Sequence, residues 1–154
     1  MYKVLDVAKY IIKYCNESDY IISNLKLQKI LYFVQAEFLI CTDNACFSED
    51  IRAWDFGPVI PEVYYKYKVY GSANIPYVKF DEKISLTDKN LINGIIDECS
   101  QYSASHLVEI TCNQEPWINA YKSHISNIIE PRNIKQYFEY EHEKEYDDIS
   151  MELS

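Results

Sequence analysis

The stretch LKLQKILYFVQAEFLIC, residues 25–41, decides the fold of this chain. Ser23 and Asn24 come directly before it, and both are residue types that cap the first turn of a helix. From Ile30 to Ile40 the helix that they would begin is apolar on nearly every side. A helix that is apolar all round is usually buried, so we expect residues 25–41 to form the central helix of a helical core.

The residues before this stretch predict an amphipathic helix. Their apolar positions follow the i, i+3, i+4, i+7 spacing of one helix face. These positions are Val4, Val7, Ala8, Ile11, Ile12 and Cys15. We therefore expect a helix over residues 3–15 with one stripe facing the core.

The residues after the central stretch predict a strand and a short helix. Residues 47–54, FSEDIRAW, alternate apolar and polar side chains, and residues 75–80, IPYVKF, are the expected hairpin or sheet partner. Between them, Pro61 is suited to the first turn of a helix, and Gly71 is suited to end it. The sheet is therefore expected to be small and peripheral.

The second half of the chain returns to helical patterns. Apolar spacing predicts helices that begin near residues 87 and 104, and Pro116 and Pro131 are suited to the first turns of two more. We predict a mainly α fold, a single compact helical domain with a small two-stranded β element and a flexible acidic C-terminal tail. The predicted domain spans residues 1–138, and the tail, residues 139–154, is expected to extend a helix or to be disordered.

Composition and charge exclude several classes of protein. A chain of 154 residues with 48% apolar and 25% charged residues is typical of one soluble globular domain. The net charge is -9, and residues 139–154 carry seven acidic side chains against one lysine. No basic footprint for phosphates is present, so direct nucleic-acid binding is disfavoured. No apolar run approaches the length of a membrane span, so we expect a cytoplasmic protein without membrane contact.

The sequence predicts no catalytic residue, no metal site and no cofactor. The five cysteines are an odd number without close pairs, and the three histidines are scattered, so neither set has zinc-ligand spacing. Three isolated glycines cannot form a phosphate-binding loop. We expect the cysteines to be reduced and to act as small apolar side chains.

Residues 53–71, AWDFGPVIPEVYYKYKVYG, concentrate aromatic side chains around two turn signals. Their glycines and prolines predict a rigid corner of strand, turn and helix. Tyrosine and tryptophan are enriched at protein interfaces because they offer large, rigid, amphipathic contact area. We predict that a partner protein binds at Trp54, Phe56, Tyr64, Tyr65 and Tyr67.

Four motifs in order along the chain resemble a known family. They are LKLQKILYFVQA at 25–36, F.E.I.AW.FGPV.PEVY.KYK.YG at 47–71, YSASHL…T…EPW.NAY at 102–121 and I..YF at 134–138. Over about residues 3–138, this combination resembles the Panacea domain, the family of SocA-like antitoxins found in phages and prophages. The combination of the first two motifs makes the resemblance specific.

The resemblance implies a mostly helical bacterial or phage domain that is not an enzyme. Such domains neutralise a protein toxin encoded beside them, commonly by direct binding, and one member delivers its toxin to a ClpXP-type protease. The chain departs from the family pattern at Thr111-Cys112, where a Thr-His pair is usual. It also has TDNACF at 42–47 in place of Gly-x-Pro-Leu-Phe.

We therefore predict an antitoxin-like protein-binding module whose partners are a cognate toxin and, if it acts as an adaptor, a ClpXP-type protease. The acidic tail is expected to help against a basic toxin. No oligomeric state is predicted. One alternative is a phage accessory protein that binds another partner, with a tail that mimics nucleic-acid charge. A less favoured alternative is a cysteine-dependent hydrolase using Cys112, because His106 lies about 600° away round a helix, a poor position for a catalytic pair.

Overall fold

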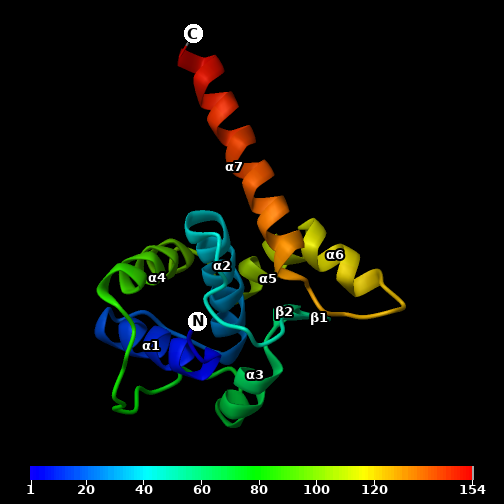
Figure 1. Ribbon diagram of the computed structural model, residues 1–154. Coiled ribbons are helices and arrows are strands. Elements are labelled where there is room, and N and C mark those ends of the chain that lie inside the picture. Colours follow the sequence, from blue (N-terminus) through cyan, green and yellow to red (C-terminus); the bar gives the residue numbers. More distant parts are fainter. Residues whose placement is uncertain (154) are drawn as a thin grey trace.

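Helix α2 (Asn24–Thr42) is the element around which the others are arranged (Figure 1). The computed structural model describes residues 1–153. The other elements are α1 (Val4–Glu17), β1 (Arg52–Trp54), β2 (Gly57–Val59), α3 (Pro61–Tyr67), the 3-10 turn η1 (Lys68–Tyr70), α4 (Leu86–Cys99), α5 (Ala104–Cys112), α6 (Glu115–Lys122) and α7 (Pro131–Leu153). Helix α2 contacts α1, α3, α4, α5, α7 and β2. The predicted central helix and the mainly α fold class are confirmed.

Local signals set the ends of the helices. The Ser23 hydroxyl accepts a hydrogen bond from the Lys26 N–H at 3.2 Å, and Asp43 ends α2 with a left-handed φ of 60°. Ser85 and Ser103 cap α4 and α5 in the same way as Ser23 caps α2. Each cap satisfies a backbone N–H that has no partner within its helix, which stabilises the helix by about 1 kcal/mol.

The amphipathic pattern of the N-terminal residues places one face of α1 in the core. Val4, Val7, Ala8 and Ile11 are fully buried, as their spacing predicts. This face packs against α2, α3 and α4. Burial of one such aliphatic side chain contributes roughly 1.5–3 kcal/mol, so α1 is held mainly by tertiary contacts.

The two-stranded sheet is a tight hairpin. The prediction that residues 75–80 pair with the strand before the hairpin turn was wrong. β1 pairs antiparallel with β2, with Trp54 opposite Gly57, and residues 75–80 form no strand. The chain reverses directly after Trp54 because Gly57 adopts a φ of +103°, which side chains disfavour. Residue 75 instead joins the N-terminal part of the fold, since the Ile75 N–H donates to the Ile22 carbonyl at 2.8 Å.

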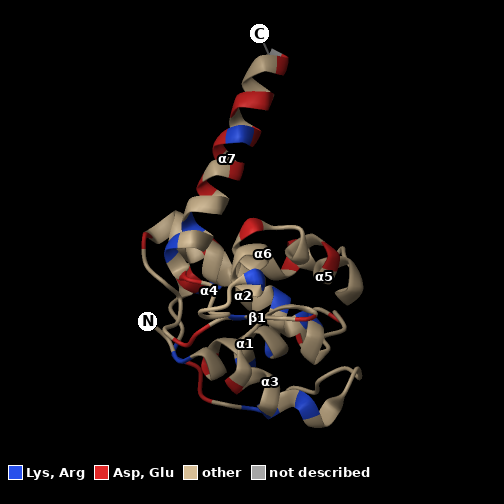
Figure 2. Cartoon of the chain, turned by 90° about the vertical axis from the view of Figure 1, so that its right-hand side faces the viewer, with Lys and Arg blue, Asp and Glu red and all other residues tan. Residues whose placement is uncertain are grey.

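Helix α7 leaves the body of the molecule after its first two turns (Figure 1). Its first turns pack on α2 through Ile134, which is fully buried, and Phe138, whose ring meets Phe33 edge-on at 6.1 Å. From Glu139 to Glu152 every side chain is exposed. The acidic segment is a continuation of helix α7, which ends at Leu153. Figure 2 shows acidic residues as successive bands along this part of the helix. Within residues 1–153, no helix combines the length and the apolarity that a membrane span requires.

Candidate functional site

Four of the five predicted partner-binding residues lie together on the surface. Trp54 ends β1, Phe56 lies in the hairpin turn, and Tyr64 and Tyr65 come from α3. The Trp54 ring meets the Tyr64 ring at 5.2 Å and the Tyr65 ring at 6.2 Å, each edge-on. Phe56 is 68% exposed and Tyr65 62% exposed, whereas Trp54 and Tyr64 are half-buried. We call Trp54, Phe56, Tyr64 and Tyr65 the aromatic surface.

The fifth residue, Tyr67, belongs to the core. Its side chain is only 7% exposed, and its ring stacks on Tyr70 at 6.4 Å. Burial raises the pKa of the Tyr67 hydroxyl to about 12. Tyr67 lies one helical turn after the buried Val63, so both residues occupy the inward face of α3. Tyr67 therefore has no part in the aromatic surface.

A groove of about 610 Å³ runs beside the aromatic surface. Trp54, Phe56 and Tyr64 form one side of it, and Asn24 and Leu25 at the start of α2 form the other. Lys68 also lines the groove, with its ammonium 5.9 Å from the centre of the Tyr65 ring. Apolar and aromatic walls with a few amide groups and one charge of each sign, Lys68 and Asp55, fit a protein side chain better than a charged small molecule.

Buried amides of α2 hold the backbone beneath the aromatic surface. Gln28 Oε1 accepts a hydrogen bond from the Ile60 N–H at 2.9 Å, and its Nε2 donates to Asn24 Oδ1 at 2.9 Å. Asn24 Nδ2 in turn donates to the Tyr64 carbonyl at 3.1 Å. The position of α3 relative to α2 is therefore set by hydrogen bonds from largely buried amides.

Lys29 supports the hairpin from below. Its side chain is fully buried, and Nζ donates to the Pro58 carbonyl at 3.0 Å. Burial lowers the pKa of the Lys29 ammonium to about 7, and the nearby Cys112 thiol opposes this shift. The lysine passes under Gly57, where an added Cβ would lie 2.7 Å from Lys29 Cε and 2.9 Å from Thr111 Oγ1. Only glycine leaves room at this position.

Helix α6 holds the hairpin from the other side. Trp117 Nε1 donates to the Trp54 carbonyl at 2.9 Å, and the Trp117 ring stacks on Tyr121 at 4.4 Å. The Tyr121 hydroxyl donates to Asp55 Oδ1 at 2.6 Å. The aromatic surface is thus presented by backbone that α2 and α6 hold on two sides.

Periodicity and composition did not reveal this buried polar support, although the sequence carries a signal for it. The signal is polar side chains within a helix that is otherwise apolar all round, namely Gln28, Lys29 and Gln35. Gln35 Nε2 donates to the Phe47 carbonyl at 2.9 Å, and its Oε1 accepts from the Cys46 N–H at 2.8 Å. Polar side chains that recur along a buried helix therefore mark where irregular backbone crosses it.

The surroundings of Cys112 and His106 do not favour a nucleophile and base. Burial raises the pKa of the Cys112 thiol, whereas an activated cysteine needs a lowered one. The exposed His106 stacks on Tyr102 at 5.2 Å, and its Nδ1 lies 3.8 Å from Glu109 Oε2. Among residues 1–153, no three His, Cys, Asp or Glu side chains are grouped so that they could hold a metal ion.

Comparisons with known proteins agree with these motifs. Residues 27–118 match the family model described as "Antitoxin SocA-like, Panacea domain". The chain belongs to the SocA-like, Panacea-domain family. Antitoxin SocA of Caulobacter vibrioides (strain NA1000 / CB15N) is 35% identical over 89 residues, which are 58% of this chain and 44% of that protein. The chain thus spans less than half the length of this relative, and no solved structure matches it.

The part of the chain that matches the Panacea-domain model contains the whole aromatic surface and most of its support, while Asn24 and Tyr121 lie outside it. It begins at Leu27, just before Gln28 and Lys29, and ends one residue after Trp117. The residues that carry the family resemblance in LKLQK and FGPV are largely buried ones that hold the hairpin. Family membership suggests an antitoxin role.

Proposed function

We propose that this protein is an antitoxin that binds a cognate protein toxin through the aromatic surface and neutralises it by direct contact. The observation that carries the proposal is the exposure of Phe56 and Tyr65 beside Trp54 on rigid backbone, in a Panacea-domain protein. Exposed apolar rings on a preformed surface lose little conformational entropy when a partner covers them. The raised pKa of Cys112 further supports action without catalysis.

Co-expression with the adjacent open reading frame tests the proposal as a whole. We expect that the adjacent gene alone stops growth, that co-expression restores growth, and that the two proteins co-purify. An adjacent gene that is harmless by itself and whose product does not co-purify would remove the antitoxin function. Restored growth in a host that lacks ClpX would show that neutralisation proceeds without delivery to that protease.

The double substitution Phe56→Ala and Tyr65→Ala tests the aromatic surface. We expect toxin binding, measured by calorimetry, to weaken by about 10- to 30-fold, since the two most exposed rings at the site are removed. The free energy of unfolding is expected to change by less than about 0.5 kcal/mol, because both side chains are mainly in water. Tyr64 is left in place because it packs on Trp54.

Tyr140→Ala is the matched control for this double variant. Tyr140 is 64% exposed, a value close to that of Tyr65, but it lies on α7. We expect Tyr140→Ala to bind the toxin as the wild type does. Equal affinity of the wild type and the Phe56/Tyr65 variant would exclude the aromatic surface as the toxin-binding site while leaving the antitoxin function intact.

A further inference from the structure

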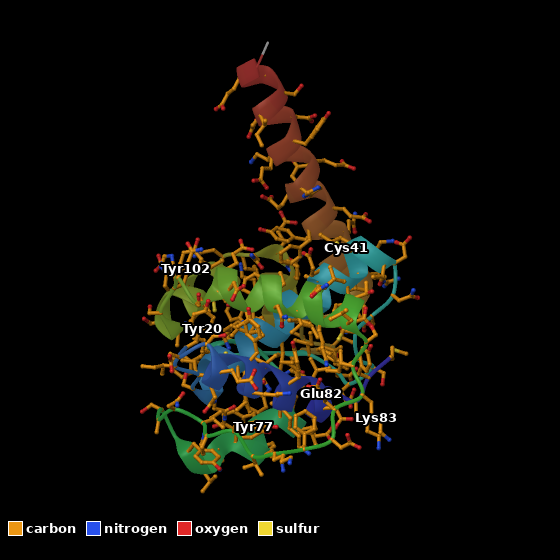
Figure 3. The ribbon with its side chains drawn as sticks, turned by 90° about the vertical axis from the view of Figure 1, so that its left-hand side faces the viewer. Tyr20, Cys41, Tyr77, Glu82, Lys83 and Tyr102 are labelled. Carbon is orange, nitrogen blue, oxygen red and sulfur yellow. The ribbon has the colours of Figure 1, made fainter. Side chains whose placement is uncertain are left out.

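A second groove, of about 800 Å³, lies between α7 and the body of the molecule. Helices α2, α4 and α5 form its floor, and α7 forms its wall. Figure 3 shows Cys41 near the end of α2 beside the base of α7, and Tyr102, which lines the groove, at the upper left of the body. We call this the α7 groove. It shares no lining residue with the groove beside the aromatic surface.

The floor of the α7 groove is apolar. It is lined by half-buried side chains from four helices, so apolar surface faces the open space. These side chains are Phe33, Ile40, Ile95, Ile110 and Phe138. Contiguous exposed apolar surface of this kind is typical of sites where another chain docks.

The face of α7 that borders the groove changes from apolar to acidic where the helix leaves the body. Ile134 and Phe138 pack on α2, and the next residues on the same face are acidic. At spacings of three or four residues these are Glu141, Glu145, Asp148 and Glu152, all of which line the groove. The wall therefore presents a row of carboxylates above an apolar floor, and Figure 2 shows the acidic bands along this helix.

Carboxylates also line the α7 groove from the helices of its floor. Glu37 comes from α2 and Glu98 from α4, and the only lysine among the lining residues is Lys144. Within residues 1–153, no ion pair joins any of these six carboxylates to a base. At the base of α7, by contrast, Lys135 lies 2.6 Å from Asp43. The like charges that line one groove repel unless cations lie between them.

We propose that the α7 groove binds a basic amphipathic helix of a protein partner. One apolar stripe of such a helix would cover the apolar part of the floor, and lysine or arginine side chains on its flanks would pair with the carboxylates of α7 and with Glu37 and Glu98. A phosphate-rich ligand or an anionic membrane would be repelled by the same carboxylates. A second copy of this chain has a net charge of -9, so it would be repelled by the carboxylates of the groove. The proposal goes beyond toxin binding at the aromatic surface and holds whether or not the partner is a toxin.

Two α7 variants with the same charge test this proposal. Glu141→Gln with Glu145→Gln removes two carboxylates from the groove face. Glu143→Gln with Asp147→Asn removes two from the opposite face of the same helix, at the same i, i+4 spacing. Net charge and helix length are therefore matched, and only the face differs.

The probe is a synthetic 18-residue helical peptide with leucines on one stripe and lysines and arginines on both flanks. We expect its affinity for the full chain, measured by fluorescence anisotropy at 0.15 M salt, to fall about 10-fold with the groove-face variant. The opposite-face variant is expected to bind within about twofold of the wild type. A peptide of the same composition with its leucines scattered is expected to bind weakly to all three proteins.

Two outcomes would overturn the proposal. One outcome is that the two variants weaken peptide binding equally, or that the scattered peptide binds as well as the striped one. Binding would then depend on net charge alone, and the groove would have no role. If sedimentation shows a dimer that only the groove-face variant loses, a second copy of this chain occupies the groove. The Phe56/Tyr65 variant is expected to retain full peptide binding, so failure here is distinguishable from failure at the aromatic surface.

Discussion

Gly57→Ala is expected to lower the free energy of unfolding by about 3 kcal/mol, a large fraction of the 5–15 kcal/mol typical of a domain. Two effects add. Gly57 has a φ of +103°, which an alanine adopts only with strain, and the new Cβ would lie 2.7 Å from the fully buried Lys29 Cε. The lysine cannot move aside without losing its hydrogen bond to the Pro58 carbonyl. Urea denaturation of the variant and the wild type measures the loss.

The two other glycines separate these effects. Gly71 also has a positive φ, +56°, but an added Cβ would meet nothing within 4 Å, so Gly71→Ala is expected to cost only about 1 kcal/mol. Gly94 lies exposed in α4 with open space around it, and Gly94→Ala is expected to stabilise by about 0.5–1 kcal/mol. If Gly57→Ala cost no more than Gly71→Ala, close packing of Lys29 under the hairpin would be refuted.

Lys29→Met is expected to remove a strong pH dependence of stability. The folded-state pKa of Lys29 is about 7, against an ordinary value of 10.5. Between these pH values the unfolded chain holds the proton and the folded chain does not, so stability rises with pH. From pH 6 to pH 9 the wild type is therefore expected to gain about 3 kcal/mol from this residue, and the methionine variant to gain none of it. Below pH 7 the Lys29 amine is protonated in both the folded and the unfolded chain. The buried charge then destabilises the folded state by its full amount.

Denaturation of both proteins at pH 6, 7.5 and 9 measures this difference. Titrating groups other than Cys112, which interacts with Lys29, contribute equally to the wild type and the variant, so the comparison isolates Lys29 together with this one neighbour. Lys79→Met is the matched control, because Lys79 is exposed, and its profile is expected to follow that of the wild type. Parallel profiles for the wild type and Lys29→Met would mean that the buried amine keeps an ordinary pKa.

Position within the fold separates the buried residues of the family motifs that hold the hairpin from the exposed residues proposed to contact the toxin. Gln28 and Lys29 are buried and hold the buried Pro58 and the backbone after it, whereas Phe56 projects from the hairpin turn and Tyr65 from α3. Substituting an exposed ring alters what a partner touches and leaves the hydrogen bonds below unchanged. A domain built in this way can present different contact residues on one supporting framework.

Local features of the fold were predictable from the sequence. Ser23 caps α2, Pro131 begins α7, and Val4, Val7 and Ile11 line one buried face, as spacing and capping preferences indicate. The partner of β1 was not predictable in this way. Residues 75–80 have a strand-like composition, but the backbone of Ile75 bonds with Ile22 from another part of the chain.

The aromatic surface was only partly predictable, because the burial of each ring depends on contacts with distant parts of the chain. Composition alone marked five aromatic residues, and it could not distinguish the buried Tyr67 from the exposed Tyr65, which lies two residues earlier on the same short helix. Which side of α3 faces inward is decided by the amide bonds from α2 that set its orientation. Tyrosines lie on both sides of this helix, so their presence alone does not show which side is buried.

The sequence by itself determined the central helix, the caps, the hairpin corner and the family of this protein. Each of these depends on residues within a few positions of one another or on a run of motifs. The tertiary structure decided where Lys29 is buried, which rings are exposed, and that the acidic face of α7 lies over an apolar groove. The physical reason is that burial, pKa and charge complementarity depend on neighbours that are distant in the chain.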